Sequence, residues 1–233
     1  MLQAMVAAAE RVFEFLEQPE EIETTKGEID TSKIKGNVEF KHVNFGYDED
    51  KTIINDFSAN IKEGQKIAIV GPTGAGKTTM VKLLMRFYDV NSGEINIDGH
   101  NIKDFKRGEL RKMFGMVLQD TWLFGGTVKE NIKYGNEEAT DGEVIEAAKA
   151  AHVHHFIKTL PKGYNSILNE ESSNVSAGQK QLLTIARVIL ANPKILILDE
   201  ATSSIDIRTE IQIQKAMDNL MEGRTSFIIA HRL

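Results

Sequence analysis

The chain has 233 residues, and 41% of them are hydrophobic. Its formal net charge is −6, and it has no cysteine. This composition is typical of one large folded domain, and the lack of cysteine excludes disulfide bridges and thiolate metal sites. The acidic balance, with no basic stripe, argues against a nucleic-acid partner. No apolar run approaches the roughly 20 residues that a membrane-spanning helix needs.

The first segment has apolar residues at helical spacing between Leu2 and Leu16, and Pro19 and a run of glutamates end the pattern. It predicts an amphipathic helix. Residues 17–35 are rich in Glu, Thr and Lys and predict a solvated linker.

The predicted body of the domain begins near residue 36. Apolar side chains alternate from residue 38 and then slip by one position, which predicts a strand with a bulge near His42. Residues 93–102 predict an antiparallel hairpin that turns at Asp98-Gly99. Short apolar runs at 66–70, 194–199 and 226–230 predict strands of a parallel sheet that are buried on both faces.

Helical patterns lie between these strands, most clearly at residues 141–160 and 178–191. An alternation of strands with helical segments indicates an α/β fold. The antiparallel piece would lie at one edge, and a helical insertion would occupy about residues 120–180.

The stretch "GPTGAGKTT" fits the pattern of a P-loop and lies between a predicted strand and a predicted helix. Glycines let backbone N–H groups turn toward a phosphate, and the helix adds the positive end of its dipole. Lys77 is expected to neutralise the β- and γ-phosphates, and the Thr78 hydroxyl to bind Mg²⁺. A glycine-rich turn with a solvated lysine is the alternative. The expected nucleotide-binding residues are Gly71, Pro72, Thr73, Gly74, Ala75, Gly76, Lys77, Thr78 and Thr79.

Two adjacent acids end the apolar run "ILILDE". Asp199 is placed to hold Mg²⁺, usually through water, and Glu200 to polarise an attacking water as general base. An acidic pair that caps a following helix is the alternative.

The polar segment "SNVSAGQKQ" precedes this run. Ser176 is a good N-cap, and the N–H groups behind it would form an anion site at a helix end. The alternative is that Ser176 only caps the helix while Gln179 faces solvent.

Taken in order, "GPTGAGKTT", "SNVSAGQKQLLTIARVIL", "ILILDEATSSID" and "AHR" resemble the nucleotide-binding domain of an ATP-binding cassette (ABC) transporter. The resemblance implies a P-loop NTPase core with a mainly parallel sheet, an antiparallel β subdomain and a helical subdomain at about residues 120–190. It also implies that Ser176, Gly178 and Gln179 cap the γ-phosphate of ATP held by a partner domain. We refer to residues 173–181 as the signature segment.

Further roles come from the resemblance alone. Gln119 matches the glutamine that contacts Mg²⁺ or the attacking water, with a solvated loop glutamine as the alternative. His231 matches the histidine directed at the γ-phosphate. With Lys77 and Glu200 they form the expected catalytic set. Tyr47 matches the aromatic residue that stacks on adenine, although it could equally belong to the core.

Other positions concern the partner domain and departures from the family. Asp206 matches the loop that touches the opposite subunit, with a helix cap as its alternative. Ala177 and Ser172 stand where the family usually has glycine. A methyl at position 177 removes freedom at positive φ.

The resemblance implies that two such domains, from identical or different chains, hydrolyse Mg-ATP and power transport. The segments "TWLFGGTVKENI" and "AAAERVFEFLEQPEE" are similar to the exporter type, with transmembrane domains fused N-terminally and the ATPase at the cytoplasmic face of the membrane. We expect residues 1–18 to be the end of the last membrane helix, residues 19–35 to form a linker, and residues 36–233 to form a nucleotide-binding domain that is cut after His231. A drug, lipid or peptide would be exported. The alternatives are an importer ATPase subunit, a soluble ABC ATPase without a transport role, and a nucleotide-binding module without turnover.

Overall fold

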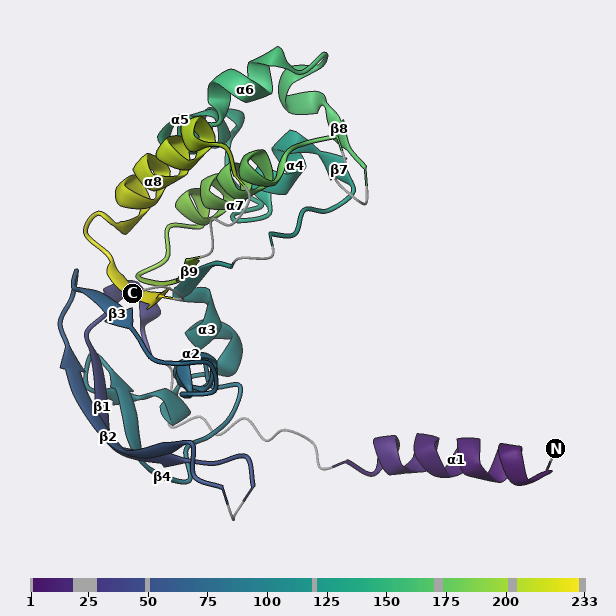
Figure 1. Cartoon of the computed structure of the whole chain (residues 1–233), viewed down its shortest axis with the longest axis vertical. Helices are drawn as coiled ribbons and strands as arrows, with labels where there is room; N and C mark the ends of the chain where they lie inside the picture. The colour runs from purple at the N-terminus through teal and green to yellow at the C-terminus, as the bar shows by residue number, and fades with distance from the viewer. Residues whose placement is uncertain are drawn as a thin grey trace.

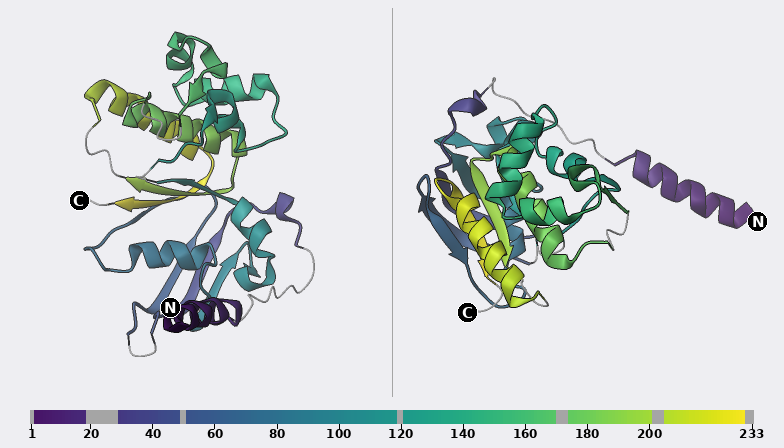
Figure 2. Two further views of the ribbon diagram at one scale, coloured as in Figure 1. Left: turned by 90° about the vertical axis from the view of Figure 1, so that its right-hand side faces the viewer. Right: turned by 90° about the horizontal axis from the view of Figure 1, so that it is seen from above.

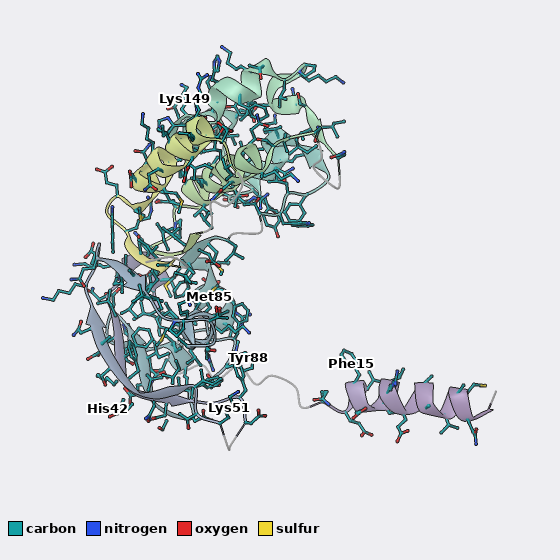
Figure 3. All side chains as sticks on the ribbon, viewed as in Figure 1. Phe15, His42, Lys51, Met85, Tyr88 and Lys149 are labelled. Carbon is teal, nitrogen blue, oxygen red and sulfur yellow. The ribbon has the colours of Figure 1, made fainter. Side chains whose placement is uncertain are left out.

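The structure is a computed structural model that describes residues 2–18, 29–48, 51–118, 121–169, 174–200 and 205–230. Two sheets lie in the lower part of the molecule in Figure 1, and most helices lie above them. Helix α1 (Leu2–Leu16) stands apart from both, and its apolar side chains are exposed, with Phe15 at 78% (Figure 3). The predicted first helix is therefore confirmed.

The antiparallel sheet has the strand order β2-β1-β4-β5. Its strands are β1 (Val38–Phe45), β2 (Ile54–Ile61), β4 (Ser92–Ile97) and β5 (His100–Asn101). The register of β1 shifts between Phe40 and Val43, and His42 has φ of 47°, so the predicted bulge is confirmed. Asp98 and Gly99 both have positive φ, at 47° and 81°, as a tight hairpin turn requires.

The parallel sheet has the order β3-β10-β9-β6. Its strands are β3 (Lys66–Ile69), β6 (Phe114–Val117), β9 (Ile195–Glu200) and β10 (Thr225–Ala230). The predicted parallel pairing is confirmed. Burial on both faces holds for β9 but is wrong for β3, where Lys66 and Ala68 are exposed. The reason is that β3 lies at the edge of this sheet among the described strands.

One of the two predicted helical segments is divided in the structure. Residues 178–191 form α7 (Ala177–Ala191) as expected, but residues 141–160 divide into α5 (Asp141–Ala150) and α6 (His154–Thr159). His152, at φ of 57°, separates these two helices. The others are α2 (Lys77–Leu84), α3 (Arg107–Lys112), α4 (Val128–Lys133) and α8 (Ile207–Met221), with 3-10 turns η1 (Thr31–Lys33), η2 (Ile102–Asp104) and η3 (Gly163–Asn165). A small ribbon joins β7 (Gly126–Thr127) to β8 (Ile167–Leu168).

The parallel sheet separates two hydrophobic cores. Ile195 and Ile197 of β9 face the core shared with the antiparallel sheet and α2. Leu196 and Leu198 face the core built with α5, α7 and α8. Figure 2 shows the two layers on either side of this sheet. One strand thus positions both halves of the molecule.

The end of the segment 17–35 differs from its prediction. Ile34 is buried and belongs to the first core, so this part of the predicted linker is not solvated. The hydrophobic contact outweighs the polar residues around it. None of the described helices is long and apolar enough to span a bilayer.

Candidate nucleotide-binding site

The expected site lies along the carboxyl ends of the parallel strands. The P-loop follows β3, and Asp199 is the penultimate residue of β9. Ile229 of β10 pairs with both Ile69 and Asp199, so Asp199 is level with the end of β3 and two strands away from it. Two strand spacings of about 4.8 Å separate them. In open α/β sheets ligands bind at this edge.

The P-loop presents an uncapped helix end. Gly74 and Gly76 have φ of 85° and 87°, a region that glycine adopts without strain. Gly76 is the N-cap of α2 and has no side chain to accept from the first turn. By contrast, α4, α5 and α7 each begin with a capping box. The N–H groups at the start of α2 are therefore suited to an anionic ligand.

Lys77 folds back over the same loop. Its Nζ donates to the carbonyl oxygens of Gly71 at 2.6 Å and Pro72 at 3.2 Å. Thr78 is exposed in the first turn of α2, and Thr79 is buried behind it. The predicted P-loop residues are thus brought together, with the ammonium group above the loop.

Tyr47 lies beside the P-loop helix. Its hydroxyl is 3.3 Å from Oγ1 of Thr79, and it is 44% exposed, so it is not a core residue. The rings of Phe45 and Tyr88 meet it edge-on at centroid distances of 5.0 and 5.1 Å. Lys82 Nζ lies 5.7 Å from the centroid of the Tyr47 ring. This arrangement holds a flat ring at the surface, as base stacking requires.

Tyr88 and Lys82 were not expected at this site. Tyr88 follows α2 and is labelled in Figure 3. No motif marks either residue, because they meet Tyr47 only in the folded chain, where the ring of Tyr88 and the ammonium group of Lys82 lie against the Tyr47 ring.

The acidic pair ends β9. Asp199 is half-buried, and the backbone of Glu200 completes the strand, while the Glu200 side chain lies outside the described residues. Gln119, Ser172 and His231 also lie outside them. A hydroxyl at Thr78 and a carboxylate at Asp199 are hard oxygen donors of the kind that Mg²⁺ prefers. This donor set fits the predicted metal.

The described end of the signature segment begins α7. Ser176 is the N-cap: its Oγ accepts the Gln179 N–H at 3.2 Å, and Oε1 of Gln179 accepts the Ser176 N–H at 2.9 Å. Gln179 therefore contributes to the cap and does not simply face solvent. Ala177 is the first helical residue and has no positive φ, so the freedom that a methyl removes is not used at this position.

Asp206 caps α8. It accepts the Thr209 N–H at 3.0 Å, which is the helix-cap alternative. Hydrogen bonds from the Thr209 hydroxyl and backbone hold the pKa of the Asp206 carboxyl below its usual value. Contact with an opposite subunit remains a prediction.

Arg187 of α7 is a further residue that no motif predicted. Its Nε and Nη2 donate to the carbonyl oxygen and side-chain oxygen of Asn131 at 2.8 and 3.1 Å, and Nη1 donates to the Trp122 carbonyl at 3.2 Å. The guanidinium lies 5.5 Å from the ring centroids of both Phe124 and Tyr134. A lone arginine inside the apolar run "LLTIARVIL" was the available signal.

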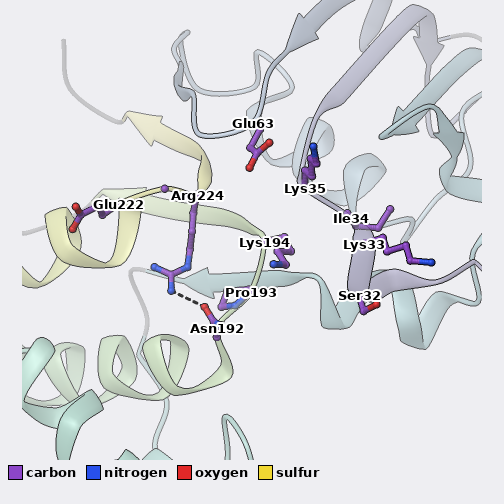
Figure 4. Close-up of a pocket in the computed structure, with 11 residues that line it drawn as sticks. Ser32, Lys33, Ile34, Lys35, Glu63, Asn192, Pro193, Lys194, Glu222 and Arg224 are labelled. Atoms are coloured by element: carbon purple, nitrogen blue, oxygen red, sulfur yellow. Dashed lines mark hydrogen bonds between the residues drawn. The ribbon is translucent and has the colours of Figure 1, made fainter.

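A cavity of about 330 Å³ lies at the amino ends of the parallel strands, opposite the expected nucleotide site (Figure 4). Lys194 and Arg224, which line it, precede β9 and β10. Arg224 donates to the Leu220 carbonyl at 2.6 Å and to the Asn192 side chain at 2.8 Å. These acceptors lie at the carboxyl ends of α8 and α7, where cations are stabilising. Arg224 therefore stabilises the carboxyl ends of α7 and α8.

Comparison with known proteins decides the family, because the model of the ABC transporter family matches residues 54–203. The chain belongs to the ABC transporter family. It is 56% identical over 232 residues to a fatty acid ABC transporter ATP-binding/permease protein of Mycobacterium tuberculosis, covering 100% of this chain and 36% of that protein. It is 54% identical over 228 residues to the uncharacterized ABC transporter ATP-binding protein YfiC of Bacillus subtilis, covering 98% of this chain and 38% of that protein.

A solved structure of a bacterial Atm1-family ABC exporter with ATP bound is also similar. It has a TM-score of 0.80 and 39% sequence identity, covering 99% of this chain and 40% of that chain. The chain thus spans less than half the length of these relatives. The predicted family and fold class are confirmed, and ATP is the nucleotide that the family implies.

Proposed function

We propose that this chain is the ATP-binding and ATP-hydrolysing domain of an ABC exporter. It pairs with a second nucleotide-binding domain around two Mg-ATP molecules, at the cytoplasmic face of a membrane, and drives transmembrane domains fused on its N-terminal side. The P-loop between β3 and α2, with its uncapped helix end, carries the ATP-binding part. The ATP-binding/permease names of the relatives support the link to a membrane domain.

ATP would lie across the carboxyl edge of the parallel sheet. The N–H groups of the loop and of α2 bind phosphate oxygens, and Lys77 exchanges its bonds with Gly71 and Pro72 for bonds to the β- and γ-phosphates. Tyr47 stacks on adenine from its position beside Thr79. These contacts fix the triphosphate before reaction.

Thr78 and Asp199 would hold Mg²⁺, which neutralises charge on the phosphates when bound. Glu200 accepts a proton from the attacking water, Gln119 orients that water, and His231 donates to the γ-phosphate. Gln119 and His231 belong to segments that follow β6 and β10, whose carboxyl ends lie at the same edge as the end of β9. Catalysis then rests on positioning and electrostatic stabilisation.

The signature segment would act on the ATP of the partner domain. Helix α7 lies among the helices in the upper part of Figure 1, whereas α2 and the P-loop lie with the sheets below. Ser176, Gly178 and Gln179 are thus on a different part of the chain from its own phosphate loop, which supports a role in trans.

The decisive experiment measures the solution mass of Glu200→Gln with and without Mg-ATP, since blocked hydrolysis should trap the ATP-bound pair. The expected result is a doubled mass that requires Mg-ATP and is lost when Ser176→Arg is added. Lys77→Ala is the control for binding through the P-loop. A monomer in every condition, or a dimer indifferent to Ser176→Arg, would contradict the sandwich.

A further inference from the structure

Gly178, the second residue of α7, is in unusually close contact with the start of α8. It is buried, and a Cβ at this position would lie 2.3 Å from Cγ2 of Thr209 and 3.2 Å from Cγ2 of Ile205. Real Cβ contacts are essentially never closer than 3.0 Å. The φ of Gly178 is not in the left-handed region, so the backbone itself would accept alanine. Space, rather than conformation, requires glycine here.

The Thr209 methyl cannot easily turn away. The Thr209 hydroxyl bonds to the Asp206 carboxylate, and the backbone N–H of Thr209 donates to the same carboxylate at 3.0 Å. A β-branched side chain has few allowed rotamers in a helix, and this bond selects one of them. Asp206 thereby fixes the methyl that faces Gly178.

We infer that Thr209 is a positioning residue: its methyl seats the first turn of α7 through Gly178, and the Asp206 cap holds it there. The inference rests on the proposed function, because it assigns the chain's own α8 the task of orienting the signature segment toward the partner's ATP. Glycine is then required at position 178 because α8 packs directly against it. If glycine only left room for the partner's phosphate, the side chain of Thr209 would have no effect on Gly178→Ala.

Thermal melting of Gly178→Ala, Thr209→Ser and the double variant tests the contact in the chain itself. In an uncrowded helix, glycine to alanine raises the melting temperature by about 1 to 4 °C. Here we expect Gly178→Ala to lower it. Thr209→Ser keeps the hydroxyl that bonds to Asp206 and removes only the methyl. Adding it to Gly178→Ala should therefore bring the melting temperature of the double variant back toward that of the parent.

The second measurement is the Mg-ATP concentration that half-dimerises the chain, with Glu200→Gln present in every variant. Gly178→Ala should raise this concentration at least about tenfold, as expected for overpacking, and the double variant should return to within about threefold of the parent. Thr209→Ser alone should leave the binding of Mg-ATP to the monomer unchanged, since Thr209 lies in α8 and outside the P-loop.

A higher melting temperature for Gly178→Ala, or a double variant as impaired as Gly178→Ala, would overturn the inference. If the Glu200→Gln parent stays monomeric, the proposed sandwich fails, while the melting rescue still decides the contact between Gly178 and Thr209. The two failures are therefore distinguishable.

Discussion

Arg187→Met should destabilise the chain strongly, because Arg187 connects α7 to the segment that contains α4. Methionine retains most of the aliphatic length and removes the guanidinium. The loss falls on Asn131, which is almost fully buried and itself bonds to the backbone of Phe124 and Thr127. The substitution should therefore also weaken the hydrogen bonds that hold the loop before α4.

The size of the expected loss in unfolding free energy follows from the three hydrogen bonds of Arg187. Two of them reach Asn131 at partly buried positions, and bonds to charged groups contribute about 1.5–3 kcal/mol each. The bond to the Trp122 carbonyl is exposed and counts for little, since water replaces it. The contacts with the Phe124 and Tyr134 rings add about 0.5–1 kcal/mol each. Because the bonds share one acceptor residue and are not independent, we expect a net loss of about 3 kcal/mol.

The assay is urea denaturation, with thermal melting beside it. A loss of about 3 kcal/mol corresponds to roughly 6–12 °C for a domain of this size. Arg187→Lys should fall between wild type and Arg187→Met, because a single ammonium cannot bond to both oxygens of Asn131. Arg208→Met, at an exposed position on α8, is the matched control and should change stability by less than about 0.5 kcal/mol. If Arg187→Met is no worse than this control, the reasoning is refuted.

Three further predictions follow from the site and the hairpin. Lys77→Ala should slow Mg-ATP hydrolysis at least about 100-fold without lowering the melting temperature, and hydrolysis at the wild-type rate would contradict the site. Tyr47→Ala should weaken ATP binding about 5- to 20-fold and Tyr88→Ala about 2- to 5-fold, while the affinity for inorganic triphosphate stays constant; equal losses for both ligands would exclude base stacking. Asp98→Asn should cost about 1–2 kcal/mol at pH 7 and progressively less in acid, as measured by urea denaturation across pH.

The sign for Asp98 follows from its environment. Burial alone would raise the pKa of its carboxyl, but hydrogen bonds from Asn37, Gly36 and Lys35 outweigh burial and lower that pKa below the usual value. The stabilisation is therefore complete above the unfolded-state pKa and is lost as the pH falls through the lower folded-state pKa. Asparagine tolerates the positive φ of this position, so backbone strain does not confound the variant. A stability difference that stays constant from pH 7 to pH 3 would contradict this account.

Local chemistry explains which elements were predictable. The bulge at His42 and the turn at Asp98-Gly99 leave a mark in the alternation of the sequence, and the P-loop has a fixed spacing. The end of α5 has no such mark. The His152 N–H bonds to the Lys149 carbonyl, and the Val153 N–H to the Ala148 carbonyl, as in a Schellman motif whose left-handed position usually holds glycine or asparagine. A histidine there hides the end of the helix.

Contacts between distant elements explain the rest. Tyr88 reaches Tyr47, and Arg187 reaches Asn131, only after the sheet and the helices have packed. The exposure of β3 likewise depends on its place at the edge of the sheet, which a run of four residues does not encode. Motif spacing therefore predicts the residues that would contact the phosphates, but it does not predict the residues that position other side chains by packing.

The first turn of α7 illustrates this difference at two neighbouring residues. The family pattern has glycine at both positions, so spacing alone directs attention to Ala177, the departure from it. In the fold Ala177 is exposed and helical, and its methyl meets no requirement for positive φ. Gly178, which matches the pattern, is the residue with no room for a methyl, because Thr209 lies 2.3 Å from where its Cβ would be. Two neighbouring positions of one motif thus differ in what they require, and only the position of α8 distinguishes them.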